Sequence, residues 1–305
     1  LFSSVPALLL LALLTQTLFP QRPRLVLLAT LLLVINPLHL FYSQEVRMYG
    51  LAMTITLASS LAFWRTFMRV GGRWRSWWLA YIVLATAALY TLYYCAFLLL
   101  AHLLWAIWHA RRQWRTLRVV LLTYLIIALL YTPWVVYTAT NLLTYVDDKV
   151  GADQDQPLSL LAYLWRHGIA FLAGHLPWIE WTNAWRWVAV AVVLLLGGWH
   201  LWYHNWRHYW RHHHAIVRPT AEASRALWLF LLLPSAIAFA VNRIFPFFPE
   251  GGERLLLFVL PYALLLVAVG IDQTWQRGLM GKGVLLVLLL TAGMGIYTFY
   301  TLPRH

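Results

Sequence analysis

Charged residues are scarce in this chain of 305 residues, since Asp, Glu, Lys and Arg together make up 11% of it. Ordinary soluble domains contain about 25% charged residues and roughly 45–50% apolar ones. Here 62% of the residues are hydrophobic and the mean hydropathy is +0.67, which excludes a water-soluble globular protein. The composition predicts an all-α, polytopic membrane protein.

Other features are also rare or missing. The single cysteine, Cys95, excludes an internal disulfide and stands within an apolar run, as a small hydrophobic residue does. Neither G-x-x-x-x-G-K-[ST] nor G-x-G-x-x-G occurs, so nothing supports nucleotide-driven transport or the use of a cytoplasmic nucleotide sugar. The formal net charge is +13, but the basic residues stand in short clusters between apolar runs. That distribution indicates membrane topology, and no nucleic-acid partner is expected.

Apolar runs that are bounded by charge, Pro or Gly predict the membrane spans. The run 77–110 is too long for one crossing and has arginine clusters on both sides, so we expect two short helices that turn near Tyr93. The total is then about ten spans in one transmembrane domain over residues 1–305. The other predicted spans are 1–19, 25–41, 46–68, 119–139, 185–203, 226–242, 254–271 and 283–301.

The basic residues also orient these spans. Most of the 23 lysines and arginines fall on one side, which the positive-inside rule assigns to the cytoplasm, and most of the ten acidic residues fall on the other. The outer side then presents a tight turn at 42–47, a long segment at 140–184 and a loop at 243–254. We expect 140–184, with its amphipathic stretch 158–178, to form one or two helices on the membrane surface.

The outer turn at 42–47 gathers polar side chains beside two apolar spans. Charges in that position are costly unless they are solvated, paired or functional. Two interpretations are open: an interfacial turn with tyrosines at the membrane surface, or a functional site. Pro37, a few residues earlier, is expected to kink or end the preceding helix. The turn and its flank contain Tyr42, Ser43, Gln44, Glu45, Arg47 and Tyr49.

This stretch resembles a motif of the GT-C fold glycosyltransferases that use polyprenyl-phosphate sugars. That superfamily includes the protein O-mannosyltransferases and the lipid A aminoarabinose transferases. Their bacterial relatives commonly show a proline, four residues and then Tyr-Ser-x-Glu-x-Arg-x-Tyr, as Pro37 and residues 42–49 do here. Three later segments resemble family motifs in the same order, and together the matches cover most of 1–271. They are LYTLYYCAFLLL at 89–100, YTPWVVY at 131–137 and PEGGERLLLFVLPYALLLVAVGI at 249–271.

The resemblance implies transfer of a sugar from a polyprenyl-phosphate donor to a lipid, glycan or protein acceptor on the non-cytoplasmic side. It further implies a multi-pass protein of the bacterial inner membrane that acts in the cell envelope, for example in lipopolysaccharide modification. The leaving lipid phosphate requires fixed positive charge, which an arginine supplies best. Arg47 and Arg254 fit this role, and Arg243 is a weaker third candidate. Tyr42, Ser43, Glu45 and Tyr49 are candidate supporting or substrate-binding residues, with Glu45 expected to orient Arg47.

The chain also departs from the family pattern. Leu92 and Leu255 replace a His and a Tyr of the family's motifs. In the family, two further spans and an outer loop precede the residues that resemble 1–19, and this loop carries the acidic general base. We therefore expect the base to lie upstream of Leu1, and the chain as given to lack it. An alternative for Arg254 is a solvated flank that is balanced by Glu250 and Glu253.

Two further groups are candidate metal ligands. The acidic cluster of the outer segment is interpreted as a solvated loop. Carboxylates also suit a divalent ion, but the spacing of these residues lacks the calcium-loop pattern. No metal or other cofactor is therefore assigned. A histidine stripe follows the span 185–203 at helical spacing, which zinc sites also use. Tryptophans and arginines alternate with it, so an anchor that faces anionic lipid head groups is favoured. These residues are Asp147, Asp148, Asp153, Asp155, His200, His204, His208 and His212.

Two other functional classes compete with the transferase. A secondary transporter or lipid flippase usually places charged groups near the bilayer midplane, within detectable repeats. Here the charges cluster at the ends of spans, which favours chemistry at the membrane boundary. A non-catalytic membrane scaffold is the third interpretation.

Overall fold

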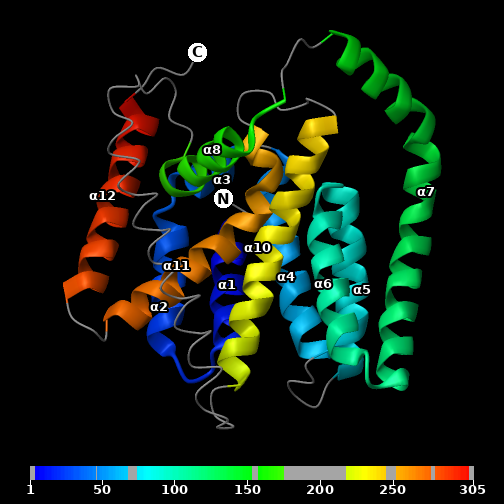
Figure 1. Ribbon diagram of the computed structural model, residues 1–305, viewed down its shortest axis with the longest axis horizontal. Coiled ribbons are helices and arrows are strands. Elements are labelled where there is room, and N and C mark those ends of the chain that lie inside the picture. The colour runs from blue at the N-terminus through cyan, green and yellow to red at the C-terminus, as the bar shows by residue number, and fades with distance from the viewer. Residues whose placement is uncertain are drawn as a thin grey trace. The chain divides into compact units, whose positions relative to one another are not determined.

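The computed structural model describes residues 4–45, 47–67, 74–152, 157–174, 218–244, 252–275 and 279–301. Within these ranges every regular element is a helix, which confirms the all-α class (Figure 1). The elements are α1 Ser4–Leu18, α2 Pro23–Val34, α3 Pro37–Gln44, α4 Met48–Phe67, α5 Trp74–Thr91, α6 Cys95–Ala110, α7 Trp114–Ala152, α8 Leu160–Ala173, α10 Arg218–Ile244, the 3-10 helix η2 Gly252–Val259, α11 Leu260–Trp275 and α12 Leu279–Thr301.

Among the described residues, three helical segments are long and apolar enough to cross a membrane. They are Trp114–Ala139, Glu222–Arg243 and Gly252–Gln273. The helices α2 and α3 make a fourth crossing if this pair, bent by 58°, counts as one span. These segments indicate a membrane protein. The predicted span 185–203 and the histidine stripe at 200–212 lie outside the described residues.

Two predicted breaks in the helices are confirmed. The helix α5 ends at Thr91 and α6 begins at Cys95, so the run 77–110 forms two short helices on either side of Tyr93. The helix α2 ends at Val34, and Pro37 is the first residue of α3. Proline has no backbone N–H and disfavours helical geometry in the preceding residue, and Asn36 is accordingly extended, with φ −69° and ψ 121°.

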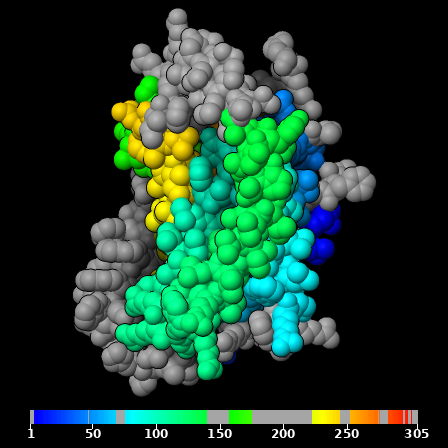
Figure 2. Space-filling view, turned by 90° about the vertical axis from the view of Figure 1, so that its right-hand side faces the viewer, coloured from blue at the N-terminus to red at the C-terminus, as the bar shows by residue number. Residues whose placement is uncertain are grey.

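The helix α7 is longer than the predicted span 119–139. It begins at Trp114 and continues to Ala152, so residues 140–152 of the expected outer segment are helical and continuous with the candidate span. Its 39 residues correspond to a length of about 58 Å, against about 30 Å for the hydrocarbon core of a bilayer. Figure 2 shows this helix along the face toward the viewer. The helix α8, at Leu160–Ala173, falls within the predicted amphipathic stretch.

The described residues belong to two compact units, each of which is considered by itself. The first comprises Leu1–Arg47, Leu164–Trp228 and Leu260–His305, and the second Met48–Tyr163 and Leu229–Val259. In the first, α2 packs against α1 and α11, and α12 packs against α11 and α3. In the second, α4 packs against α5, α6 and η2, while α7 packs against α5 and α6. The single transmembrane domain over 1–305 stays a prediction, because one membrane domain can contain two compact units.

A chain of buried hydrogen bonds joins the helices of the second unit. Ser60 Oγ on α4 lies 3.0 Å from His102 Nε2 on α6, and Tyr81 Oη on α5 lies 3.4 Å from His102 Nδ1. The hydroxyls of Tyr81 and Tyr124 are 2.7 Å apart, and Tyr124 on α7 donates to the Leu99 carbonyl at 3.0 Å. Each tyrosine hydroxyl has one proton to donate. Tyr124 gives its proton to the Leu99 carbonyl, so it accepts the hydrogen bond from Tyr81. Tyr81 in turn accepts from His102, which places the imidazole proton on Nδ1. Such linked bonds hold helices together where lipid offers no partner.

Close backbone contact fixes the start of α3 in the first unit, because Pro37 lies between two glycines. Gly174 has a φ of +79°, and a Cβ there would lie 2.8 Å from Pro37 Cβ. A Cβ on Gly295 of α12 would overlap the Ala173 carbonyl and lie 2.6 Å from Pro37 Cγ. The helix α12 therefore approaches α3 and the end of α8 at a distance that only glycine permits.

Replacing this glycine tests the contact. We expect Gly295→Ala to lower the unfolding free energy by about 1–3 kcal/mol, because the added methyl group overpacks the junction. Gly293→Ala, two residues away on α12, is the matched control, since a Cβ there meets nothing within 4 Å. Alanine in that open helical position raises stability by about 0.5–1 kcal/mol. Thermal unfolding in detergent, followed by circular dichroism, measures both; equal effects of the two substitutions would contradict the contact.

Candidate functional site

Asn36 positions the helix that leads into the outer turn. Its side-chain Oδ1 accepts a hydrogen bond from the backbone N–H of His39 at 3.0 Å, and its Nδ2 donates to the Phe171 carbonyl at 2.6 Å. Asparagine is a preferred N-cap residue, and proline at the first helical position is already in helical geometry. The buried Asn36 thus starts α3 and ties it to the last turn of α8.

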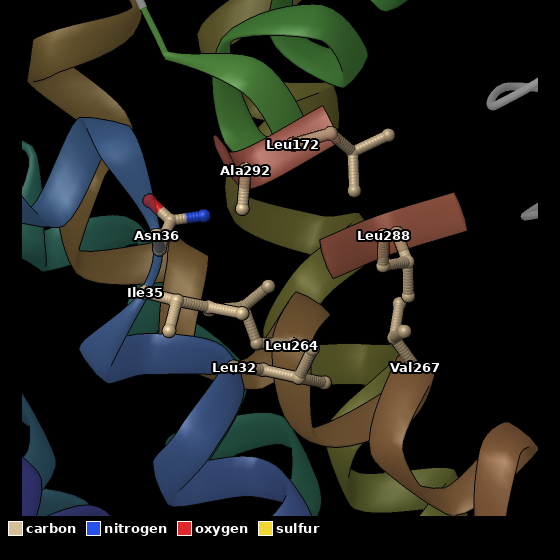
Figure 3. A pocket seen from close by; sticks show the side chains of 8 residues that line it. All are labelled: Leu32, Ile35, Asn36, Leu172, Leu264, Val267, Leu288 and Ala292. Atoms are coloured by element: carbon tan, nitrogen blue, oxygen red, sulfur yellow. The ribbon is translucent and has the colours of Figure 1, made fainter. Parts of the chain in front are cut away.

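A small hollow borders this amide (Figure 3). Asn36 is the one polar side chain in its lining, and its amide already donates to Phe171 and accepts from His39. A sugar or a phosphate would find few polar partners there. We therefore place no polar substrate in this hollow. The other lining residues are Leu32, Ile35, Leu172, Leu264, Val267, Leu288 and Ala292.

The turn at the end of α3 contains four of the predicted site residues. Tyr42 is buried, and Ser43 donates its hydroxyl to the Leu40 carbonyl of its own helix at 2.7 Å. Glu45 ends α3 in an extended conformation, and its Oε2 lies 3.9 Å from Arg47 Nε. The predicted Glu45–Arg47 pairing is therefore present. With side chains 30% and 53% exposed, such a pair contributes little to stability.

The second unit brings together two predicted site residues that are far apart in the sequence. Tyr49 lies in the first turn of α4 and is buried. The guanidinium carbon of Arg254, on η2, lies 5.6 Å from the centroid of the Tyr49 ring. This is a cation–π contact, which is stronger where water is excluded. The Nε of Arg254 is buried and has no hydrogen-bond partner among the described residues. An unpartnered buried donor carries an energetic cost, which an anion that reached it would relieve.

Glu253 is buried, with 7% of its surface exposed, so it is not the solvated flank that the sequence suggested as a balance for Arg254. Burial raises the pKa of the Tyr163 phenol, and Tyr94 and Glu253 raise that pKa further. Tyr163 donates its hydroxyl to the Ser235 carbonyl at 3.1 Å. Glu253, Tyr94 and Tyr163 are therefore close enough to influence one another electrostatically. Arg254 is the next residue in the chain after Glu253. Of Glu253 and the two tyrosines, Glu253 was named from the sequence, since it stands next to the motif arginine.

The remaining candidate residues lie elsewhere. Leu92 and Leu255, the departures from the family motifs, are buried and fill apolar space. Arg243 is exposed in the last turn of α10. Within the described residues, no three His, Cys, Asp or Glu side chains lie close enough together to hold a metal ion. Asp147 and Asp148 fall in the helical continuation of α7, whereas Asp153 and Asp155 lie outside the described residues.

Comparisons of the chain with models of protein families, with curated protein sequences and with solved structures found no match. The interpretation of the site therefore rests on its own residues and on the resemblance of the motifs.

The hydrogen bonds of Asn36 can be tested by exchange measurements on α3. In Asn36→Ala both bonds are lost, so we expect the amides of residues 38–44 to exchange at least about tenfold faster, since a lost cap costs about 1 kcal/mol or more. Ser43→Ala is the control, because the hydroxyl bond to Leu40 that it removes lies within α3 itself. Hydrogen–deuterium exchange with mass spectrometry provides the readout. Unchanged exchange in Asn36→Ala would show that α3 does not depend on this amide.

Proposed function

We propose that this chain is a membrane glycosyltransferase that transfers a sugar from a polyprenyl-phosphate donor to a lipid, glycan or protein acceptor on the non-cytoplasmic side. The contact between Tyr49 and Arg254 carries the proposal. These residues belong to two separate motifs of the resembled superfamily. Their contact holds a guanidinium in a fixed, partly buried position with one N–H unpartnered among the described residues.

The proposed reaction gives this cation a defined task. When the bond between the sugar and the phosphate breaks, the leaving polyprenyl phosphate gains negative charge on its oxygen. A guanidinium that is already fixed stabilises that charge without reorganisation during the reaction. In this scheme Arg254 and Arg47 bind the donor phosphate, with Glu45 restricting Arg47. Tyr42, Ser43 and Tyr49 line or support the site, and the acceptor hydroxyl loses its proton to a carboxylate base.

The architecture is part of the proposal. About ten spans in a GT-C arrangement would consist of the long helices α7 and α10, the η2–α11 segment, the bent pair α2–α3 and the shorter apolar helices, together with residues 185–203. The proposed location is the bacterial inner membrane, with the turn at 42–47 and the loop at 243–254 on the outer face. The asymmetry of the basic residues supports this orientation.

A proton-coupled transporter is the less favoured alternative. Its buried polar groups would have to pass protons onward. In the second unit, the hydrogen-bonded chain through Ser60, His102, Tyr81 and Tyr124 ends on the Leu99 backbone carbonyl. A carbonyl oxygen accepts a hydrogen bond but has no proton to pass on. This chain of hydrogen bonds therefore serves helix packing better than proton transport.

Substitution of the two arginines tests the site. In the natural full-length protein, we expect Arg254→Ala and Arg47→Ala each to lower the transfer rate by about 10²–10³-fold, because fixed positive charge at the leaving phosphate is lost. Arg254→Lys should retain part of the rate, since it keeps a charge but not the planar donors. The measurement follows a labelled sugar from polyprenyl phosphate to acceptor in isolated membranes.

Arg166→Ala is the matched control, because Arg166 is an exposed arginine of α8 in the same predicted outer segment. Its rate should equal that of the wild type. Membrane insertion of each variant is checked by protease accessibility. Wild-type transfer by both Arg47→Ala and Arg254→Ala would remove these residues from the site.

A further inference from the structure

Four arginines surround the turn between α6 and α7, and all four are exposed. Within the described residues, none of them forms an ion pair. The sequence contains no Asp or Glu between Glu45 and Asp147, so the helical segments from α4 to the spanning part of α7 offer no acidic partner. The turn thus carries four positive charges that no acidic side chain among the described residues neutralises by an ion pair. The four residues are Arg111, Arg112, Arg115 and Arg118.

Tryptophans hold two of these guanidinium groups at the helix ends. The guanidinium carbon of Arg111 lies 5.5 Å from the centroid of the Trp108 ring, and that of Arg118 lies 5.0 Å from the Trp114 ring. A guanidinium that lies over an indole ring still has N–H groups for another acceptor, such as a phosphate oxygen. Tryptophan beside arginine is also the pairing expected at the level of lipid head groups.

A third pair of the same kind lies at this end of the unit. The guanidinium carbon of Arg65, near the end of α4, lies 4.5 Å from the Trp77 ring at the start of α5. Since α5 and α6 are joined by a short turn and both pack against α7, the start of α5 and the turn between α6 and α7 fall at one end of these helices (Figure 1). It is the end that the positive-inside rule assigns to the cytoplasm.

Apolar side chains continue directly from the charged turn. Leu104 and Trp108 on α6 are 43% and 41% exposed, and Leu121 and Leu122 on α7 are 47% and 54% exposed. The candidate span of α7 begins at Trp114, immediately after the first arginines. A soluble anion would contact the charges alone. An anion that carries hydrocarbon chains would contact both the charges and the apolar surface.

We propose that the turn between α6 and α7 binds an anionic phospholipid, with the phosphate on Arg111, Arg112 and Arg115 and the acyl chains along the exposed faces of α6 and α7. Arg118 and Arg65 add positive charge beside the phosphate. This surface goes beyond the proposed transferase, because it requires no sugar donor and lies at the opposite end of the predicted spans.

Lipid binding by the purified protein tests the proposal. The protein is placed in phosphatidylcholine nanodiscs, and brominated phosphatidylglycerol is titrated in while quenching of tryptophan fluorescence is followed. Because each basic residue near an anionic head group contributes roughly a fivefold gain in affinity, Arg111→Gln/Arg112→Gln/Arg115→Gln should weaken phosphatidylglycerol binding by on the order of a hundredfold. The corresponding triple lysine variant should bind within about tenfold of the wild type, since it keeps the charge but loses the bidentate donors.

The matched control removes the same amount of charge elsewhere. Arg24→Gln/Arg166→Gln/Arg225→Gln changes three exposed arginines that lie outside the turn and outside the proposed donor site, and its binding should equal that of the wild type. Because arginines also orient spans, protease accessibility first establishes the orientation of each variant. If the glutamine variant inserts wrongly, the wild type alone decides. Brominated phosphatidylglycerol must then quench its fluorescence more strongly than brominated phosphatidylcholine, and this difference must become smaller at high salt.

Several results would overturn the proposal. Equal quenching by the two brominated lipids would show ordinary bilayer contact. Unchanged phosphatidylglycerol binding by a correctly inserted glutamine variant would show that the lipid does not bind at this turn. Full displacement of the lipid by glycerol phosphate, inorganic phosphate or an oligonucleotide would identify the turn as a site for soluble anions.

Discussion

Asn36 and Pro37 stand where α2 bends into α3, among side chains that are almost all apolar. A break in a helix leaves backbone N–H and carbonyl groups without partners, and hydrocarbon cannot supply them. Here the Asn36 amide bonds the His39 N–H and the Phe171 carbonyl, and Pro37 has no N–H to satisfy. Gly174 and Gly295 leave room for the proline ring. The position of α3, and of Glu45 at its end, depends on these contacts.

The second unit meets the same constraint in another way. Its helices contain few polar side chains, and four of them bond to one another across α4, α5, α6 and α7: Ser60, His102, Tyr81 and Tyr124. At the Arg254 position, in contrast, a buried donor is left without a partner among the described residues. A satisfied network holds helices together, whereas an unpartnered cationic donor carries an energetic cost that a bound anion would relieve. This contrast distinguishes the packing role of His102 from the binding role proposed for Arg254.

Much of the helical pattern follows from the sequence, because charge, proline and the length of apolar runs determine where helices in lipid end. The bend at Pro37 and the turn near Tyr93 were predictable for that reason. The full length of α7 was not, since residues 140–152 combine polar and apolar side chains and offer no clear stop before Gly151. Nor could the sequence show that Glu253 is buried, because its position in a polar loop resembles that of a solvated charge.

Pairings between distant residues were the least predictable feature. Apolar helices in lipid lack the polar outer face that reveals the inward side of a soluble helix, so nothing in the sequence pairs Tyr49 with Arg254 or Asn36 with Phe171. The motif resemblance selected Tyr49 and Arg254 separately, and the structure added their contact. For Tyr163 no sequence signal existed, because it is one aromatic residue among many others. Tyr94 lies in the motif-like segment 89–100, but nothing in that segment distinguishes it from the neighbouring tyrosines.

Donor selection by the purified full-length protein is the most direct test of the central claim. The same labelled sugar would be presented on polyprenyl phosphate and on a nucleoside diphosphate, with lipid, glycan and protein acceptors supplied in turn. The proposal predicts that label reaches an acceptor only from the lipid-linked donor, with one polyprenyl phosphate released for each sugar transferred. Transfer of the sugar from the nucleoside diphosphate would contradict the proposal. So would a lipid-linked donor that remains intact in the presence of each of the three acceptors.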